Sequence, residues 1–235
     1  MPIEYIDSLD RHDRVLALQH IALAWHKTQK VPRAIQLEAA REAAKDRDSF
    51  IYTGTGSGKT LCSALTMWFD ALDASRSHSN TSNGSIYITV SPLKRLQESQ
   101  VKLFREDFQI PSVAINHETP TEEDWWNANV YNPGDRTLGT ARHLIITVEQ
   151  LFKNDGGHYT RLGRYIRDHI TFKRCVKCVF VDKAHNVRMA GSELYGSPAF
   201  RPAWGKLGEL KIHVPKLVWQ GFSVTAPPHI IDEPA

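Results

Sequence analysis

Short runs of β-branched and other apolar residues alternate along this chain with stretches in which apolar residues recur at helical spacing. The runs predict strands at residues 49–52, 86–90, 113–115, 144–148, 176–181 and 217–219. The stretches between them predict helices at residues 9–25, 33–45, 61–72, 93–108 and 159–170. Nearly continuous apolar strands that alternate with helices are typical of a parallel sheet buried on both faces. We therefore predict an α/β fold with a doubly wound, mostly parallel sheet, whose ligands gather at the carboxyl ends of the strands.

The same pattern divides the chain into two unequal parts. Residues 1–30 predict an N-terminal helical extension, and residues 31–235 carry every predicted strand and form the α/β domain. Residues 75–85, SRSHSNTSNGS, contain no apolar side chain and predict a surface loop within that domain.

Composition narrows the class of protein mainly by exclusion. The chain has 41% hydrophobic and 23% charged residues, which excludes a disordered or fibrous protein. No apolar run reaches the roughly 18–20 residues of a membrane span, and the charged start of the chain is unlike a signal peptide. Three cysteines are too few for a disulfide framework, so we expect an intracellular protein with no membrane partner. The net charge of +3 permits nucleic-acid binding without arguing for it.

A glycine-rich segment between a predicted strand and a predicted helix is the strongest chemical signal. Backbone N–H groups of such a loop curl around phosphate oxygens, and the helix N-terminus adds positive partial charge. Lys59 would reach the β- and γ-phosphates of ATP, and the Thr60 hydroxyl would hold Mg²⁺. The general pattern has glycine at the first position, where this chain has threonine, and a turn that binds nothing is the alternative. The segment consists of Thr53, Gly54, Thr55, Gly56, Ser57, Gly58, Lys59 and Thr60.

Two further polar segments follow predicted strands. Residues 91–97, SPLKRLQ, with Gln100 after them, follow one strand, and residues 147–151, TVEQL, follow another. A helix is predicted to begin near Pro92, so amide groups at that helix start could meet a phosphate. The second segment occupies the equivalent place after its strand. The alternative is that both segments are ordinary strand-to-helix connections.

A third strand runs into residues 179–185, VFVDKAH, and delivers Asp182 to the sheet edge, where it can hold Mg²⁺ opposite Thr60. Residues 199–210, AFRPAWGKLGEL, follow as an aromatic-rich segment. Taken in order, the motifs of residues 33–230 resemble the RecQ-like branch of the superfamily 2 DNA helicases, whose enzymes are ATP-dependent and move 3′–5′. This resemblance implies a RecA-like phosphate-loop NTPase lobe.

The resemblance assigns the nucleotide site as follows. The phosphate loop would bind ATP together with Mg²⁺, and superfamily 2 helicases relax the loop position that Thr53 occupies. Arg33 and Gln36 match the Arg-x-x-Gln spacing of the family's adenine-reading motif. A glutamine amide presents one donor and one acceptor together, which suits an adenine edge. A solvated helix residue is the alternative for Gln36.

The resemblance also implies contacts with single-stranded or partly unwound DNA. Phe200 and Trp204 would stack on unpaired bases, and Arg201 would meet phosphates. Packing in the core is the alternative for the two aromatic residues. Contacts to the DNA backbone would come from Pro92, Leu93, Gln97, Gln100, Thr147, Glu149 and Gln150.

Two motifs depart from the family pattern. Residues 223–225, Ser-Val-Thr, resemble the Ser-Ala-Thr motif that links nucleotide state to DNA binding, with Ser223 and Thr225 as coupling residues. Residues 182–185 resemble Asp-Glu-Ala-His, and His185 is retained. Lys183, however, stands where the family has the catalytic glutamate that deprotonates the attacking water. A lysine ammonium has no lone pair to accept a proton, so we expect impaired hydrolysis.

The leading functional hypothesis is the ATP- and nucleic-acid-binding lobe of a RecQ-like helicase, truncated, hydrolysis-impaired, and nuclear if the source is eukaryotic. No second lobe follows in this sequence, and translocation needs two lobes that open and close. A catalytically inert nucleic-acid- or partner-binding module derived from such an enzyme is the first alternative. The second alternative is an unrelated phosphate-loop NTPase. The motifs at residues 182–185 and 199–210 argue against it.

Overall fold

The chain folds around one sheet of six parallel strands in the order β1-β8-β7-β2-β6-β3. The computed structural model describes residues 2–76, 84–154, 156–193 and 198–224. The predicted α/β fold with a doubly wound parallel sheet is confirmed, and every predicted strand is present. The strands are β1 Ser49–Tyr52, β2 Ile86–Val90, β3 Ser112–Ile115, β6 His143–Ile146, β7 Val176–Asp182 and β8 Val218–Ser223.

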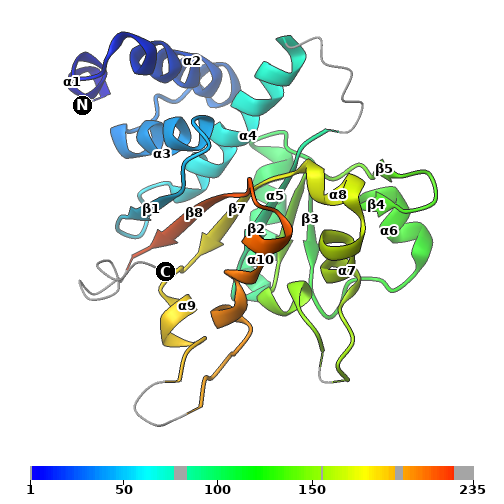
Figure 1. Cartoon of the computed structure of the whole chain (residues 1–235). Coiled ribbons are helices and arrows are strands. Elements are labelled where there is room, and N and C mark those ends of the chain that lie inside the picture. The colour runs from blue at the N-terminus through cyan, green and yellow to red at the C-terminus, as the bar shows by residue number, and fades with distance from the viewer. Residues whose placement is uncertain (1, 77–83, 155, 194–197, 225–235) are drawn as a thin grey trace.

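Helices cover both faces of this sheet because alternate residues of each strand point to opposite sides. Ile86, Ile88 and Val90 of β2 lie in one apolar core, whereas Tyr87 lies in the other. Figure 1 shows α10 in front of the strands and α5 behind them. Among the described helices, none is long and apolar enough to cross a bilayer. One face is covered by α2 Arg11–Thr28, α3 Ala34–Ala44, α4 Lys59–Arg76 and α5 Lys94–Glu106, and the other by α6 Glu123–Asn129, α7 Arg161–Asp168, α8 Ile170–Cys175 and α10 Glu209–His213.

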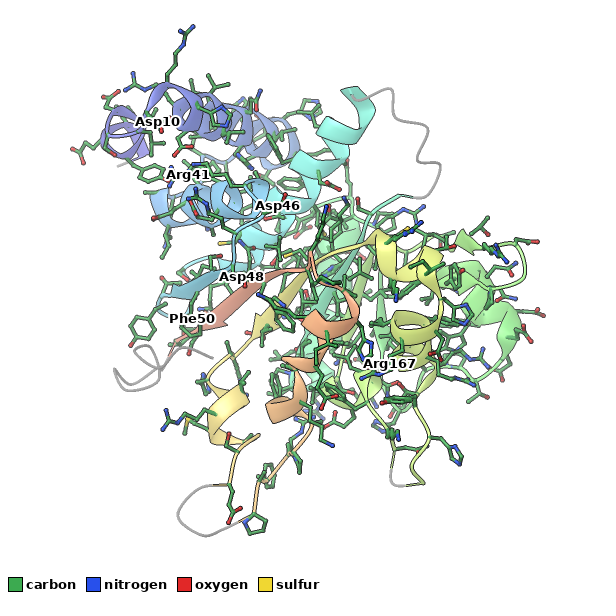
Figure 2. The ribbon with its side chains drawn as sticks, viewed as in Figure 1. Asp10, Arg41, Asp46, Asp48, Phe50 and Arg167 are labelled. Carbon is green, nitrogen blue, oxygen red and sulfur yellow. The ribbon has the colours of Figure 1, made fainter. Side chains whose placement is uncertain are left out.

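The N-terminal helices pack against the α/β domain. After the short helix α1 (Pro2–Asp7), Asp10 caps α2 by accepting a hydrogen bond from the Asp13 backbone N–H at 2.9 Å. The Asp13 carboxylate pairs with Arg41 of α3 and with Lys45 directly after it, and its hydrogen bond with Lys45 lowers its pKa. Asp10 and Arg41 are labelled in Figure 2. Ala24 belongs to the same core as α3 and α4, so α2 is part of this packing, and the boundary at residue 30 stays a prediction.

The structure departs from the sequence pattern at several connections. The strand predicted through residue 148 ends at Ile146, because Val148 begins a 3-10 helix, η1 Val148–Leu151. The helix predicted over 159–170 is two helices, which separate at the extended residue His169. Of the loop predicted at 75–85, Ser75 and Arg76 belong to α4, and residues 77–83 lie outside the described residues. Elements that the pattern did not predict are α6, α10, the hairpin strands β4 Tyr131–Asn132 and β5 Thr137–Leu138, α9 Asn186–Met189, and the 3-10 helix η2 Trp204–Lys206.

Buried histidines make the stability of this fold sensitive to acid. His143 is fully buried, it shares hydrogen bonds with Thr89 Oγ1 at 2.6 Å and Ser112 Oγ at 3.3 Å, and burial lowers its pKa to about 3. Burial likewise lowers the pKa of His20 to about 4. As the pH falls through 6.5, the unfolded chain takes up protons that the folded chain rejects, so folding becomes less favourable.

We expect the free energy of unfolding to fall between pH 7.5 and 4.5 by about 2–3 kcal/mol for each such histidine. The measurement is urea unfolding at the two pH values for the wild type, His143→Gln and, as a control, the exposed His12→Gln. His143→Gln should lose less stability on acidification than the wild type or the control. Equal losses in all three proteins would contradict a neutral, buried His143.

Candidate nucleotide and nucleic-acid site

The predicted nucleotide motifs meet at the carboxyl edge of three neighbouring strands, β1, β8 and β7. The Thr53 backbone N–H, directly after β1, donates to the Ser223 carbonyl at 3.1 Å. The N–H of Ala184, two residues after the end of β7, donates to the Phe222 carbonyl at 2.9 Å. Figure 1 shows the arrowheads of β7 and β8 pointing to the same side, toward α9. Backbone hydrogen bonds therefore hold the phosphate loop, the Asp182 segment and the Ser223 segment together.

The phosphate loop has the backbone that its glycines allow. Gly56 and Gly58 have φ values of 76° and 80°, in the left-handed region that favours glycine. A Cβ on Gly58 would lie 2.5 Å from Gln36 Nε2, whereas nothing lies within 4 Å of a Cβ on Gly54 or Gly56. The ammonium of Lys59, the first residue of α4, donates to the Thr53 carbonyl at 3.1 Å and the Gly54 carbonyl at 3.0 Å. The loop is thus preformed, with its lysine folded over it and open space on its outer side.

Gln36 supports this loop from α3. Its side chain is buried, and its Oε1 accepts a hydrogen bond from the Arg33 N–H at 2.8 Å. Its Nε2 donates to the carbonyls of Ser57 at 3.1 Å and Gly58 at 2.9 Å. Both ends of the amide are therefore engaged with protein, while the Arg33 side chain is exposed. Adenine reading by these two residues stays a prediction.

Asp182 lies at the end of β7, among groups that shift the pKa of its carboxyl. Burial raises the pKa of its carboxyl, whereas Lys183, Lys59 and a hydrogen bond from Gln100 lower it. Lys59 and Asp182, far apart in sequence, are therefore electrostatic neighbours. The Thr60 hydroxyl and the Asp182 carboxylate supply oxygen donors, the type of ligand that Mg²⁺ takes. No cluster of three or more His, Cys, Asp or Glu side chains that could hold a metal occurs within the described residues, so nucleotide phosphates would have to complete such a site.

Gln100, predicted to contact the DNA backbone, lies beside Asp182. Its amide reaches that carboxylate from α5. Its Oε1 is buried and has no hydrogen-bond partner among the described residues. The structure therefore links Gln100 to Asp182, and its contact with the DNA backbone stays a prediction.

Lys183 and His185 follow Asp182 in a tight turn. Lys183 has a left-handed backbone with φ 54°, and its carbonyl accepts from the Asn186 N–H at 2.9 Å. The His185 ring shares a hydrogen bond with Ser223 Oγ through Nδ1 at 2.9 Å. Burial lowers the pKa of His185, the Lys183 charge lowers it further, and Asp182 opposes both. A side-chain contact thus joins two of the predicted motifs, while Thr225 lies outside the described residues.

The segments predicted to contact DNA meet at Arg201. Its guanidinium Nε and Nη2 donate to the Glu149 carboxylate at 2.7 to 2.9 Å. Its Nη1 donates to the Pro92 carbonyl at 3.2 Å. Leu93 and Glu149 are exposed beside this junction, and Thr147 and Gln150 are partly buried. One arginine therefore ties together three segments from distant parts of the chain.

Two side chains assigned to DNA are instead packed inside the protein. Trp204 has 0% exposed surface and belongs to the large core, so its ring cannot stack on a base here. Phe200, in contrast, is 86% exposed. Gln97 is fully buried, donating to the Ser91 carbonyl at 3.3 Å and accepting from Asn116 Nδ2 at 3.0 Å. The predicted side-chain contacts of Trp204 and Gln97 with DNA are therefore wrong for this structure.

Asn116 is a site residue that the sequence analysis missed. It is the first residue after β3, and its amide donates to Gln97, which in turn donates to the Ser91 carbonyl. The rule that ligands gather at the carboxyl ends of strands could have found it, because polar residues directly after a strand lie at that edge.

A close backbone contact positions the aromatic-rich segment. The Arg201 N–H donates to the Ala190 carbonyl at 2.7 Å, just after α9. A Cβ on Gly191 would lie 2.2 Å from the Gly205 nitrogen, and a Cβ on Gly205 would lie 2.5 Å from the Gly191 oxygen. Only glycine fits at both positions. The helix that follows Asp182 and His185 is therefore fixed against the segment that carries Arg201.

Comparison with known proteins agrees with this geometry. The ATP-dependent DNA helicase hus2/rqh1 of Schizosaccharomyces pombe (strain 972 / ATCC 24843) is 28% identical over 194 residues, which are 83% of this chain and 13% of that protein. The DUF1998 helicase MrfA, solved bound to DNA and AMPPNP, superposes with a TM-score of 0.60 at 17% identity, over 89% of this chain and 26% of that chain. The helicase domain of Pyrococcus furiosus Hef superposes with a TM-score of 0.55 at 21% identity, over 86% of this chain and 35% of that chain. These two structures share the fold.

The family assignment rests on the sequence as a whole. The pattern of the DEAD/DEAH box helicase family matches residues 33–228, which include the phosphate loop, Asp182 and the Arg201 segment. The resemblance to RecQ-like helicases is consistent with this match and with the yeast relative. The hypothesis of an unrelated phosphate-loop NTPase is excluded. The chain belongs to the DEAD/DEAH box helicase family, and its sheet and flanking helices form one RecA-like, nucleotide-binding lobe.

Proposed function

We propose that this lobe binds ATP with Mg²⁺ and single-stranded or partly unwound DNA, but hydrolyses ATP poorly. The observation that carries the proposal is the meeting of Lys59 and Asp182 at one sheet edge, with Lys183 beside them. In this proposal, Lys59 supplies the phosphate-binding group and Asp182 a metal-binding group that ATP with Mg²⁺ requires. In place of a general base, the same sheet edge carries the ammonium group of Lys183.

The nucleotide phosphates would enter the loop between Thr53 and Thr60. There Lys59 would exchange its contacts with the Thr53 and Gly54 carbonyls for phosphate oxygens. Thr60 and Asp182 would hold Mg²⁺, which neutralises charge on the β- and γ-phosphates. Gln100 would keep the Asp182 carboxylate in position, since its amide already donates to that group.

Hydrolysis is the step that the site does not support. The attacking water needs a group that accepts its proton, and the lysine ammonium is only a donor. His185 is a weak substitute, because burial and the Lys183 charge lower the pKa of its ring and so make it a poorer proton acceptor. The same ammonium lies beside Asp182 and can compete with Mg²⁺ for its carboxylate. A catalytically inert binding module is the second candidate function, and Lys183 is the observation that favours it.

The DNA would lie across the junction of Pro92, Glu149 and Arg201. A phosphate could draw Arg201 away from Glu149, and the exposed Phe200 offers a flat face to a base. The chain spans about an eighth of the length of the yeast helicase, at 13%, so unwinding by the whole protein is a further proposal. It would require a second lobe that closes against this one.

The test of the nucleotide site is a titration of a fluorescent ATP analogue with Mg²⁺. We expect Lys59→Ala to weaken binding at least tenfold, because it removes a charge-assisted contact to phosphate. Lys30→Ala, which removes an exposed lysine elsewhere, is the matched control and should bind like the wild type. Equal affinity of all three proteins would remove the phosphate-loop proposal.

A further inference from the structure

A cavity of about 720 Å³ lies at the amino-terminal edge of the sheet, away from the phosphate loop. Tyr87, Val176 and Val218 line it, and each is the first or second residue of its strand. β7 has 7 residues, so at about 3.3 Å per residue the cavity and Asp182 lie roughly 20 Å apart. In Figure 1, α8 and α9 mark these opposite ends of β7. The cavity is therefore separate from the nucleotide site.

The part of the wall formed by α3 and by Phe69 of α4 is apolar, although Thr66 and Asp70 of α4 also line the cavity. Ala40, Ala43 and Ala44 line it from the last turns of α3, and Phe69 lines it from α4. Small alanine side chains leave width between this wall and the opposite one. The shape suits a flat or compact apolar group.

The opposite wall is basic. Lys173 and Arg174 of α8, Lys177 of β7 and Lys216 before β8 all line the cavity. Within the described residues, none of these side chains forms an ion pair with a carboxylate. His213 lies among them, and burial together with the charges of Arg167 and Lys173 lowers its pKa, while Glu209 and Asp168 act in the opposite sense. This wall therefore carries uncompensated positive charge.

The carboxylates of the cavity do not neutralise this wall. Asp70 Oδ2 accepts hydrogen bonds from Ser85 Oγ at 2.5 Å and Tyr87 Oη at 2.6 Å. These bonds hold the carboxylate of Asp70 between α4 and β2. Asp46 is exposed and belongs to the connection between α3 and β1, where Figure 2 labels it. An anionic group would therefore settle on the basic side.

We propose that this cavity is a second ligand site, which takes a small amphiphilic anion. Its apolar body packs against Phe69 and the alanines of α3, and its phosphate, sulfate or carboxylate group faces Lys173, Arg174, Lys177 and Lys216. The volume lies within the roughly 300–1,000 Å³ of ordinary small-molecule pockets. Nucleic acid fits this cavity less well than a small amphiphilic anion. Its phosphates need only a charged surface and would leave the apolar wall without a partner.

The test uses 1-anilinonaphthalene-8-sulfonate, an aromatic sulfonate whose fluorescence rises when it is bound. One variant, Lys173→Glu with Lys216→Glu, reverses charge on the basic wall, and Ala44→Trp fills the apolar side. The matched controls are Lys30→Glu with Lys206→Glu, two exposed lysines outside the cavity, and Ala22→Trp on the exposed face of α2. We expect the dissociation constant to rise at least about tenfold in both cavity variants and to stay unchanged in the controls and in Lys59→Ala.

Pyrophosphate should displace the probe from the wild type, and added salt should weaken its binding. Unchanged binding in both cavity variants would overturn the proposal. Loss in Ala44→Trp alone would show an apolar cavity without anion preference, which also overturns it. Loss in Lys59→Ala but not in the cavity variants would place the probe in the phosphate loop. Displacement by an oligothymidylate but not by pyrophosphate would assign the basic wall to nucleic acid instead.

Discussion

Replacing Lys183 with glutamate should raise ATP turnover by about 10²–10⁴-fold, the usual contribution of a positioned general base. The substitution supplies a carboxylate that can accept a proton from water and removes an ammonium that competes for Asp182. The measurement is steady-state ATP hydrolysis, with DNA, by this lobe joined to a complete second RecA-like lobe from a related helicase. Both forms should bind the ATP analogue, so the difference should appear in the rate of hydrolysis.

Lys30→Glu is the matched control for this experiment. It makes the same change of charge at an exposed position outside both proposed sites and should leave turnover unchanged. Our account of Lys183 is wrong if the lysine protein already hydrolyses ATP at a rate close to that of Lys183→Glu. An equal gain in Lys30→Glu would point to net charge rather than to a general base.

Trp204→Ala and Phe200→Ala should affect different properties, although the two residues lie in one segment. The first should reduce stability, and the second should reduce DNA binding. Removing the buried Trp204 ring should lower the free energy of unfolding by about 3–5 kcal/mol. Removing the exposed Phe200 ring should change it by less than about 0.5 kcal/mol. Single-stranded DNA binding should weaken in Phe200→Ala by roughly 1–3 kcal/mol, the value of one stacked base.

Urea unfolding and the fluorescence anisotropy of a labelled oligothymidylate, at low salt, measure these two effects. Trp204→Phe is a useful control, because it keeps an aromatic ring and removes an indole N–H that has no partner among the described residues. It should cost less stability than Trp204→Ala. A folded Trp204→Ala protein with unchanged stability would contradict its core position, and unchanged DNA affinity in Phe200→Ala would remove base stacking from the proposal.

The strands were predictable because a short run of apolar or β-branched residues is enough to indicate a buried strand. A run such as Ile86–Val90 is apolar or β-branched throughout, and all five of its residues are buried. The phosphate loop was predictable for a similar reason, since its glycines, lysine and threonine are contiguous. Short elements such as α9 and η2 were missed because four and three residues are too few to show a helical period, and because they are held by contacts with each other, including that between Gly191 and Gly205.

The roles of individual side chains were less predictable than the positions of the motifs. Gln36, Gln97 and Trp204 all occur in the expected segments, yet each is buried against partners far away in sequence. Gln36 meets Gly58, and Gln97 meets Asn116. A linear motif shows that a residue belongs to a site, but it does not show which way the side chain points.

The position of β1 in the sheet has a consequence for how the nucleotide site forms during synthesis. Among the described strands, β1 lies at the edge of the sheet and pairs with β8 alone, and Ser49 and Gln220 of this pair lie 171 positions apart in the chain. Contacts this distant in sequence close late, because the intervening loop must first lose its freedom. The segment that leads into the phosphate loop therefore has no strand partner until the ribosome has made nearly the whole lobe. A nascent chain that stops before β8 should expose the β1 edge and retain no nucleotide.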